Sequence, residues 1–291
     1  MGKASRRKAQ NKAAGIKPAK VQPAPYVARP FEGLPNQAQW VAMREIVPAA
    51  SAPVTVEVDG TSHDITLATV LPMGWPAMKR DTGEIFVALQ SLTGSGDASR
   101  DLAEVVRAAI ELEAGMPLED APRTTADSPR MQDFVKSDDL EVTVHDGFDF
   151  WVEGQDLDEA GRASMDRANE SVSPTVRMKD VPSAYWCQIG QRTYVRWILE
   201  VDEDKATDAL ARLHAAGESG LGEGRLLGAF RAYGLLVPVW EVDASVEASA
   251  HDAEMKALAA RFDKAVKNDA ALTPQERRAR NGVVSRQITL R

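Results

Sequence analysis

Three histidine–aspartate pairs are the first residues in the sequence whose types suit chemistry: His63-Asp64, His145-Asp146 and His251-Asp252. Neighbouring histidines and carboxylates hold a divalent metal when a fold brings several of them together. The first pair falls in an expected hairpin, the second beside a turn and the third near a helix start, so nothing in the spacing makes them converge. We therefore expect ordinary surface or rim histidines, and we predict no metal site, no cofactor and no catalytic residue.

The loop TGSGDAS (93–99) is a second candidate, because it separates an expected buried strand from an expected helix. Backbone N–H groups and the helix dipole can hold a phosphate or a carboxylate at such a place. The loop lacks the lysine of a P-loop, and Asp97 would repel an anion. The sequence leaves two interpretations of this loop open. One is a flexible loop with a helix cap. The other is an anion loop formed by Thr93, Gly94, Ser95, Gly96 and Ser99.

The segment around Gly190–Gln191 reads as a hairpin with a type II′ turn. Its register places alternate residues on one face, namely Tyr185, Cys187, Ile189, Arg192, Tyr194 and Arg196. Interleaved tyrosines and arginines can stack on bases, and nearby cations can lower the pKa of a thiol. Burial under a helix is the simpler expectation, since no histidine is placed beside Cys187 to activate it.

Charge is arranged in blocks along the chain. The whole chain carries a formal net charge of -8, yet its first thirty residues contain eight Lys and Arg and no acid. We expect this segment to be a disordered basic tail, because it has no apolar periodicity with which to bury surface. A tail of this kind can contact phosphates by counterion release. The candidate polyanion contacts are Lys3, Arg6, Arg7, Lys8, Lys12, Lys17 and Lys20.

Length and composition exclude several classes of protein. A chain of 291 residues with 44% hydrophobic residues can bury a core, which argues against a disulfide scaffold or a wholly disordered chain. The single cysteine cannot form an internal disulfide, so a reducing cytosol is the simplest location. No segment approaches the length of a transmembrane helix, and we predict no membrane span.

Local patterns predict an alternation of hairpins and helices. Asp59-Gly60 separates two alternating runs and predicts a type I′ hairpin over 54–71. A buried strand is expected over 84–90, followed by a helix with a capping box formed by Asp101 and Glu104. Further strands are expected around Asp146-Gly147 and over 234–240, with Pro238 favouring an edge or a bulge. The expected helices are 157–172, 202–217, one through Met255 to Val266, and one capped by Thr273 and Glu276.

These elements predict an α+β fold in which antiparallel hairpins pack with amphipathic helices and the C-terminus is helical. The pattern of aromatic, strand, turn, strand and helix occurs twice, so a duplicated β-β-α unit is one reading and a chance similarity is the other. We divide the chain as follows: a tail (1–30), an α+β unit (31–116), a linker (117–138), a second α+β unit (139–243) and C-terminal helices (244–291).

Several long runs resemble one family. They include RPFEGLPNQAQWVAMREIVPA (29–49), LARLHAAGESGLGEG (210–224), FRAYGLLVPVW (230–240) and LTPQERRARNG (272–282). The resemblance is to actinobacterial proteins grouped as domain of unknown function family 5926, and it covers nearly the whole chain. It implies an actinobacterial and cytoplasmic protein, and it supplies no activity and no catalytic residues.

Two functions follow as expectations. The first is a non-enzymatic cytosolic protein whose basic ends bind RNA, the ribosome or another polyanion, while its acidic body meets a protein partner. The second is a small-ligand binder or an enzyme that uses the Thr93–Ser99 loop. The sequence does not indicate an oligomeric state.

Overall fold

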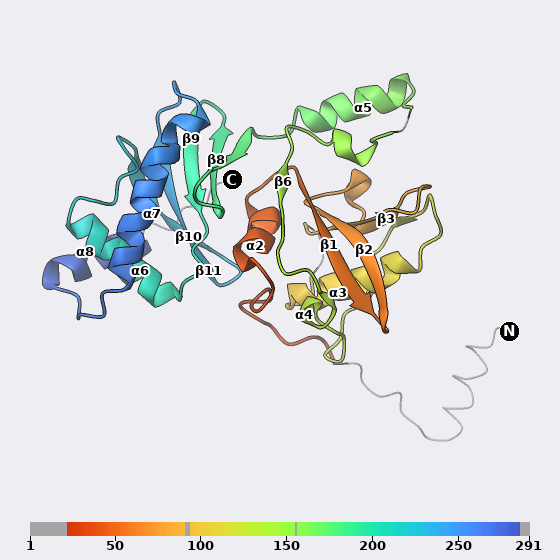
Figure 1. The fold of residues 1–291 in the computed structure, drawn as a ribbon, viewed down its shortest axis with the longest axis horizontal. Coiled ribbons are helices and arrows are strands. Elements are labelled where there is room, and N and C mark those ends of the chain that lie inside the picture. The colour runs from red at the N-terminus through yellow and green to blue at the C-terminus, as the bar shows by residue number, and fades with distance from the viewer. Residues whose placement is uncertain (1–21, 91–93, 155, 286–291) are drawn as a thin grey trace.

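A computed structural model describes residues 22–90, 94–154 and 156–285 of the chain. Two β-sheets lie next to each other, and helices pack against both of them (Figure 1). This confirms the α+β class and the helical C-terminus. No helix in the described part of the chain is long and apolar enough to cross a membrane.

The first sheet has the strand order β5-β3-β4-β2-β1-β6. Its strands are β1 (Ala50–Val58), β2 (Thr61–Ala68), β3 (Ala77–Lys79), β4 (Ile85–Ala88), β5 (Pro117–Leu118) and β6 (Thr143–Val144). The predicted β1–β2 hairpin is confirmed: Val56 pairs with His63, and Asp59 and Gly60 have φ of 50° and 79°, as a type I′ turn requires. β2 and β4 pair in parallel, which places the start of the next helix at one end of the sheet.

The second sheet is antiparallel, with the order β10-β11-β9-β8-β7. Its strands are β7 (Thr175–Arg177), β8 (Ala184–Ile189), β9 (Arg192–Trp197), β10 (Arg225–Ala232) and β11 (Leu235–Val242). The predicted turn at Gly190 is confirmed, with φ of 61° at that residue. Of the two positions predicted for Pro238, the edge is wrong, since β11 lies between two strands, but a bulge does occur next to it: the β10–β11 register shifts between Leu226 and Gly228, opposite Trp240 and Val239. β11 pairs with β9 only from Val239 onward, so the missing N–H of Pro238 interrupts no hydrogen bonding between these two strands.

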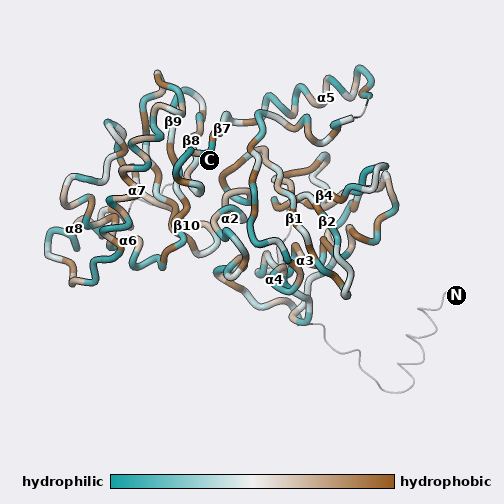
Figure 2. The backbone as a smooth tube through the Cα atoms, in the orientation of Figure 1, coloured by the Kyte–Doolittle hydropathy of each residue, from teal (hydrophilic) through white to brown (hydrophobic). Residues whose placement is uncertain are grey.

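The helices are α2 (Gln37–Glu45), α3 (Ala98–Ile110), α4 (Met131–Phe134), α5 (Glu159–Asn169), α6 (Glu203–Ala215), α7 (Asp252–Val266) and α8 (Pro274–Ser285), with 3₁₀ turns at Pro72–Gly74, Asp149–Trp151 and Ala248–His251. Gly217, with φ of 75°, follows α6 as predicted. The capping box of α8 is confirmed, because Thr273 N donates to Glu276 Oε2 and Glu276 N donates to Thr273 Oγ1. Hydrophobic colour follows the strands, whereas α8 is largely hydrophilic (Figure 2).

Helix α2 lies between the two sheets and joins their cores (Figure 1). Every residue from Gln37 to Met43 is buried, and Trp40 is completely inaccessible to solvent. One hydrophobic cluster contains Trp40 together with Tyr185 and Leu235 of the second sheet. The side chains of α2 also reach across, since Gln39 Nε2 donates to Pro182 O over 2.7 Å. The two sheets therefore share a continuous core.

Residues 117–138, predicted as a linker, fold against the first sheet. They contribute β5 at its edge and α4 beneath α3, and Met131 of α4 is completely buried. Of the strands predicted around Asp146-Gly147, the one before the turn is confirmed as β6, which pairs with β1, whereas the residues after it form a 3₁₀ turn and no strand. In that turn Phe148 and Trp151 stack at 4.2 Å and pack beneath the sheet. Apolar contact has outweighed strand pairing there.

The predicted disordered tail is too long at its C-terminal end. Residues 22–30 are described; they form no helix or strand, and they contact Gly96 in the loop before α3. Val27 N donates to Gly96 O at 3.0 Å, and Ala126 N donates to Gln22 O at 3.1 Å. Backbone hydrogen bonds do not require a periodic pattern of hydrophobic residues. The sequence therefore shows no sign that residues 22–30 pack against the fold. Residues 1–21, including the predicted contacts Lys3 to Lys20, lie outside the described residues.

The two suggested repeats share a hairpin followed by a helix, β3–β4–α3 and β8–β9–α6. Beyond that unit they differ, since β4 has a parallel neighbour in β2 whereas β9 has an antiparallel neighbour in β11. Duplication of the unit stays a prediction.

The β10–β11 turn makes a close contact that mutation can measure. Gly234 has φ of 74°, and a Cβ there would lie 2.9 Å from Ala28 O and against the Arg29 side chain. Gly60 occupies the equivalent turn position with φ of 79° and open space around it. We expect Gly60→Ala to cost roughly 1–2 kcal/mol of unfolding free energy from backbone strain alone, and Gly234→Ala to cost more. Urea unfolding of both variants checks this, and equal losses would show that residues 28 and 29 do not pack there.

Candidate functional site: a cleft between the two sheets

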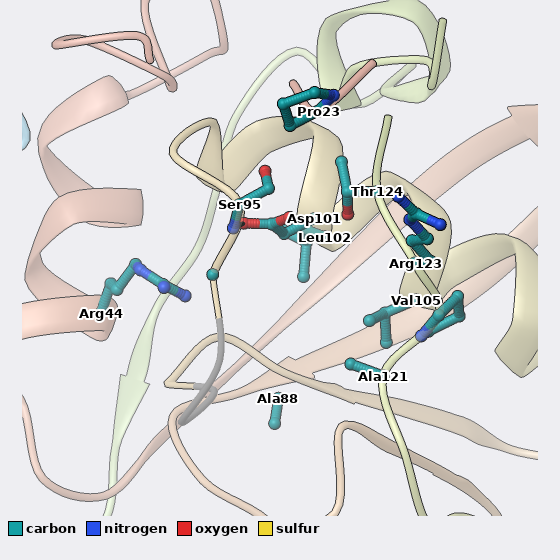
Figure 3. Close-up of a pocket in the computed structure, with 12 residues that line it drawn as sticks. Pro23, Arg44, Ala88, Ser95, Asp101, Leu102, Val105, Ala121, Arg123 and Thr124 are labelled. Atoms are coloured by element: carbon teal, nitrogen blue, oxygen red, sulfur yellow. Dashed lines mark hydrogen bonds between the residues drawn. The ribbon is translucent and has the colours of Figure 1, made fainter. Parts of the chain in front are cut away.

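Two adjoining cavities open where the loop before α3 meets α2. Their volumes are about 410 and 480 Å³, and both are lined by Arg44, Gly94 and Asp101. We call the pair the seam cleft. The first cavity is lined by Pro23, Arg44, Ala88, Gly94, Ser95, Asp101, Leu102, Val105, Ala121, Pro122, Arg123 and Thr124 (Figure 3). The second adds the N-terminal segment 26–28 and the turn of the β10–β11 hairpin.

The predicted anion loop borders this cleft, but its own carboxylates occupy its backbone donors. Ser95 N donates to Asp101 Oδ2 at 2.9 Å, and Ser99 N donates to Asp97 Oδ1 at 3.1 Å. The Ser99 hydroxyl bonds Gln132 and accepts from Met131 N. The amide groups of Ser95 and Ser99 are therefore occupied by carboxylates of the chain itself. Thr93 lies outside the described residues.

Asp97 caps α3, so the predicted capping box of Asp101 and Glu104 is wrong. The Asp97 side chain is completely buried, and its Oδ2 lies 3.3 Å from Arg100 Nε and 3.4 Å from Arg130 Nε. Arg130 precedes α4, so this carboxylate holds the starts of two helices together. Asp97 therefore has a structural role, because its contacts fix the shape of the loop before α3.

Two arginines reach the first cavity from separate elements. Arg44, in the last turn of α2, donates to Tyr233 Oη and to Leu89 O, and its guanidinium lies 5.2 Å from the centre of the Tyr233 ring. Arg123 approaches from the segment after β5, across the cavity from Arg44 (Figure 3). Neither arginine forms an ion pair with a carboxylate in the described part of the chain. Between them α3 contributes the apolar side chains Leu102 and Val105 together with the Asp101 carboxylate.

The second cavity has a more balanced charge. Arg231 Nε donates to Glu203 Oε1 at 2.7 Å, so these two groups neutralise each other. Glu45 also lines it, and burial raises the pKa of its carboxyl although Arg44 and a hydrogen bond with Tyr233 act in the opposite direction. The first cavity is lined by two arginines and one carboxylate, that of Asp101, whereas the second is lined by two arginines and three carboxyl groups, so a net positive charge is confined to the first.

The arrangement suits binding better than catalysis. Among the described residues, neither cavity is lined by a histidine or a cysteine. The two guanidinium groups and the apolar wall instead match a ligand with an anionic end and an apolar body.

Residues 30–291 match the model of a family of unknown function, DUF5926. The chain belongs to this family. No curated protein and no solved structure matches it. The match covers both sheets and α2, and it includes the residues of the seam cleft from Arg44 onward but not Pro23 or residues 26–28.

The histidine–aspartate pairs of this DUF5926 chain do not meet. His63 is on β2, His145 follows β6 and His251 ends a 3₁₀ turn before α7. In the described part of the chain, no group of three or more His, Cys, Asp or Glu side chains is placed to hold a metal ion.

The hairpin face predicted from Gly190–Gln191 is mostly covered in the DUF5926 fold. Tyr185 and Cys187 are completely buried, and Tyr185 Oη donates to Gln39 of α2. Burial raises the pKa of the Cys187 thiol, although Arg196 acts to lower it. Arg192 is exposed, whereas both tyrosines of this face are buried. The face therefore offers no tyrosine–arginine surface to a nucleic acid.

Sequence reasoning missed a serine–histidine pair that β1 and β6 bring together. Ser51 Oγ lies 2.8 Å from His145 Nε2, and the His145 ring stacks on Phe150 at 4.5 Å. The two residues are 94 apart, so no local pattern could reveal the pair. Neither residue lines the cavities described above, and a nucleophile without a substrate pocket is a poor candidate for catalysis.

His145 makes stability depend on pH. Burial lowers its pKa below the ordinary value of 6.5, despite the nearby Asp146 and Glu153. As pH falls through 6.5, the unfolded chain takes up a proton that the folded protein refuses, so folding loses stability. We expect the unfolding free energy of the wild type to fall more between pH 7.5 and 5.5 than that of His145→Gln. Urea titrations at both pH values test this, and equal falls would contradict it.

Proposed function

We propose that this protein binds a small organic anion in the seam cleft, without chemical conversion. The observation that carries the proposal is the pair Arg44 and Arg123, which approach one cavity from separate elements and have no carboxylate partner in the described part of the chain. Two guanidinium groups next to an apolar wall favour a carboxylate, sulfonate or phosphate ester with an apolar body.

The cavity itself supports this ligand class. Its volume of about 410 Å³ lies in the range of small-molecule sites, and Leu102, Val105 and Ala121 supply apolar contact. The backbone N–H groups of Ser95 and Ser99 already donate to Asp101 and Asp97, so we assign the recognition to side chains rather than to a phosphate cradle.

A fluorescent organic anion tests the proposal. Anilinonaphthalene sulfonate (ANS) carries a sulfonate on an aromatic body, and its emission rises in apolar sites. We expect one ANS per folded chain, with affinity reduced about tenfold in Arg123→Gln, because a charge-assisted hydrogen bond is worth about 1.5 kcal/mol. Arg107→Gln is the matched control. Arg107 is exposed on α3 and pairs with Glu104 outside the cleft.

A second variant tests whether ANS binding needs the free volume of the cavity. Ala121→Trp places an indole ring against Val105 and should abolish ANS binding without removing a charge. Cooperative thermal unfolding of each variant excludes ANS bound to a loosened core. Binding that is equal in Arg123→Gln, Ala121→Trp and Arg107→Gln would refute the seam cleft as the site.

The charge of the first residues favours a second function, contact with RNA or another polyanion. Residues 1–21 carry seven Lys and Arg and no acid, and the acidic remainder of the chain is suited to a protein partner. The C-terminal end contributes less, because Arg280 of α8 is paired with Asp204 and Asp208 of α6 at 2.6 Å. Arg29 likewise belongs to the fold, since it pairs with Glu32 at 3.0 Å.

Deletion of residues 1–21 tests the second function and leaves the packed segment 22–30 in place. We expect full-length protein to bind single-stranded RNA with log affinity falling against log salt at a slope of about -3, for about four phosphate contacts. The deletion should abolish this binding, measured by fluorescence anisotropy. Binding that survives the deletion, or that is insensitive to salt, would contradict the function.

We further propose a cytosolic location in an actinobacterial cell. The single cysteine supports a reducing compartment, and the family resemblance supports the origin. Detection of the protein in the soluble fraction of such cells, and its absence from washed membranes, would test the location.

A further inference from the structure

Arg196 is a buried cation at the junction of the two sheets. It lies on β9 beneath the C-terminal end of α2 and is 9% exposed. Its Nη2 donates to Ile46 O at 2.8 Å, whereas its Nε has no hydrogen-bond partner among the described residues. The Cys187 thiol is its neutral neighbour on β8.

The charge of Arg196 is only partly compensated. No described carboxylate forms an ion pair with it. The end of α2 supplies about half a negative charge through its free carbonyl groups. A buried cation with no full counter-charge is unfavourable, because burial removes the water that would solvate it. An anion bound beside Arg196 would complete the balance.

A cavity of about 180 Å³ opens beside this guanidinium, separate from the seam cleft. Ile46, Val47 and Ile189 give it an apolar wall, and Ser173 adds a hydroxyl group at its edge. The Gln90 side chain is fixed by its bonds to Met43 O and Val47 O. Glu45 also lines this cavity, but its carboxylate is engaged by Tyr233 and Arg44, which line the seam cleft instead.

We infer that this cavity binds a short-chain monocarboxylate, with its carboxylate on the Arg196 guanidinium and its alkyl end against Ile46, Val47 and Ile189. A planar carboxylate matches the guanidinium fork. A phosphate carries close to two charges at neutral pH, and one arginine cannot neutralise it. Room is sufficient, because a water molecule occupies about 30 Å³ in the liquid.

Propionate is the probe, and the readout is the folding equilibrium in sodium propionate against sodium chloride at equal ionic strength and pH 7.5. A ligand at ten times its dissociation constant raises the folding constant about elevenfold. We expect a saturable gain of this size in the wild type and none in Arg196→Met, which replaces the cation by an apolar side chain of similar length. A purely structural role of Arg196 would lower stability equally in both salts.

Ser173→Phe blocks the edge of the cavity and leaves Arg196 in place, so it covers the case in which Arg196→Met fails to fold. Ser171→Phe is its control, because Ser171 is exposed and outside the cavity. The propionate gain should disappear in Ser173→Phe and persist in Ser171→Phe. An equal gain in Arg196→Met and the wild type, or no saturable gain of the wild type in propionate over chloride, would overturn the assignment.

Discussion

Trp40→Ala is expected to lower the unfolding free energy by about 3–5 kcal/mol. Trp40 is completely buried in α2, its Nε1 donates to Pro35 O at 3.0 Å, and its ring stacks on Phe31 at 5.9 Å. The same cluster includes Tyr185 and Leu235 of the second sheet, so the cavity left by the indole weakens the contact between the sheets. Both sheets should lose stability together.

Urea unfolding followed by far-ultraviolet circular dichroism and by tryptophan fluorescence measures this effect. We expect one cooperative transition in the wild type and in the variant, with the same midpoint shift for both probes. Trp75→Ala is the control, because Trp75 is partly exposed beside the Pro72–Gly74 turn and should cost far less. Two separate transitions, only one of them shifted, would show that the sheets are independent.

Asp97→Ala is expected to lower the unfolding free energy by about 3 kcal/mol. Loss of a helix N-cap costs about 1 kcal/mol, and removal of one partner from a buried ionic contact costs more. The expected loss of unfolding free energy is at the lower end of the range for buried ion pairs, because the side chains of Arg100 and Arg130 are 22% and 29% exposed and water can solvate them.

Asp97→Asn separates the two parts of this effect. An asparagine can still accept from Ser99 N and cap α3, so the variant removes the charge and keeps the cap. We expect Asp97→Asn to lower the unfolding free energy, but by less than Asp97→Ala does. The exposed Asp127→Asn serves as the control for loss of one acid. Thermal unfolding of the three variants gives the ranking, and equal stability of Asp97→Ala and Asp127→Asn would contradict the role of Asp97.

The elements that the sequence predicted are those with local signals. The Asp59-Gly60 turn, the Thr273–Glu276 cap and the amphipathic stripe of α7 each depend on residues a few positions apart. Helix α2 was missed because it is buried on all sides and has no polar face to set a period. Strand β10 was missed because a bulge at Leu226–Gly228 interrupts its alternation.

The candidate site was located in part. The Thr93–Ser99 loop does border the cleft, but Asp97 and Asp101 take the donors that were expected to bind an anion. Arg44 and Arg123 are 79 positions apart and carry no motif, so only the tertiary fold, which brings both to one cavity, reveals them. Tertiary contacts, which local spacing does not encode, determine the site.

The most direct test of the central claim is a crystal structure of the protein with bound ANS. We expect the sulfonate to lie between Arg44 and Arg123 and the rings to pack on Leu102 and Val105. Ordered ANS at another place, with the seam cleft filled only by solvent, would contradict it.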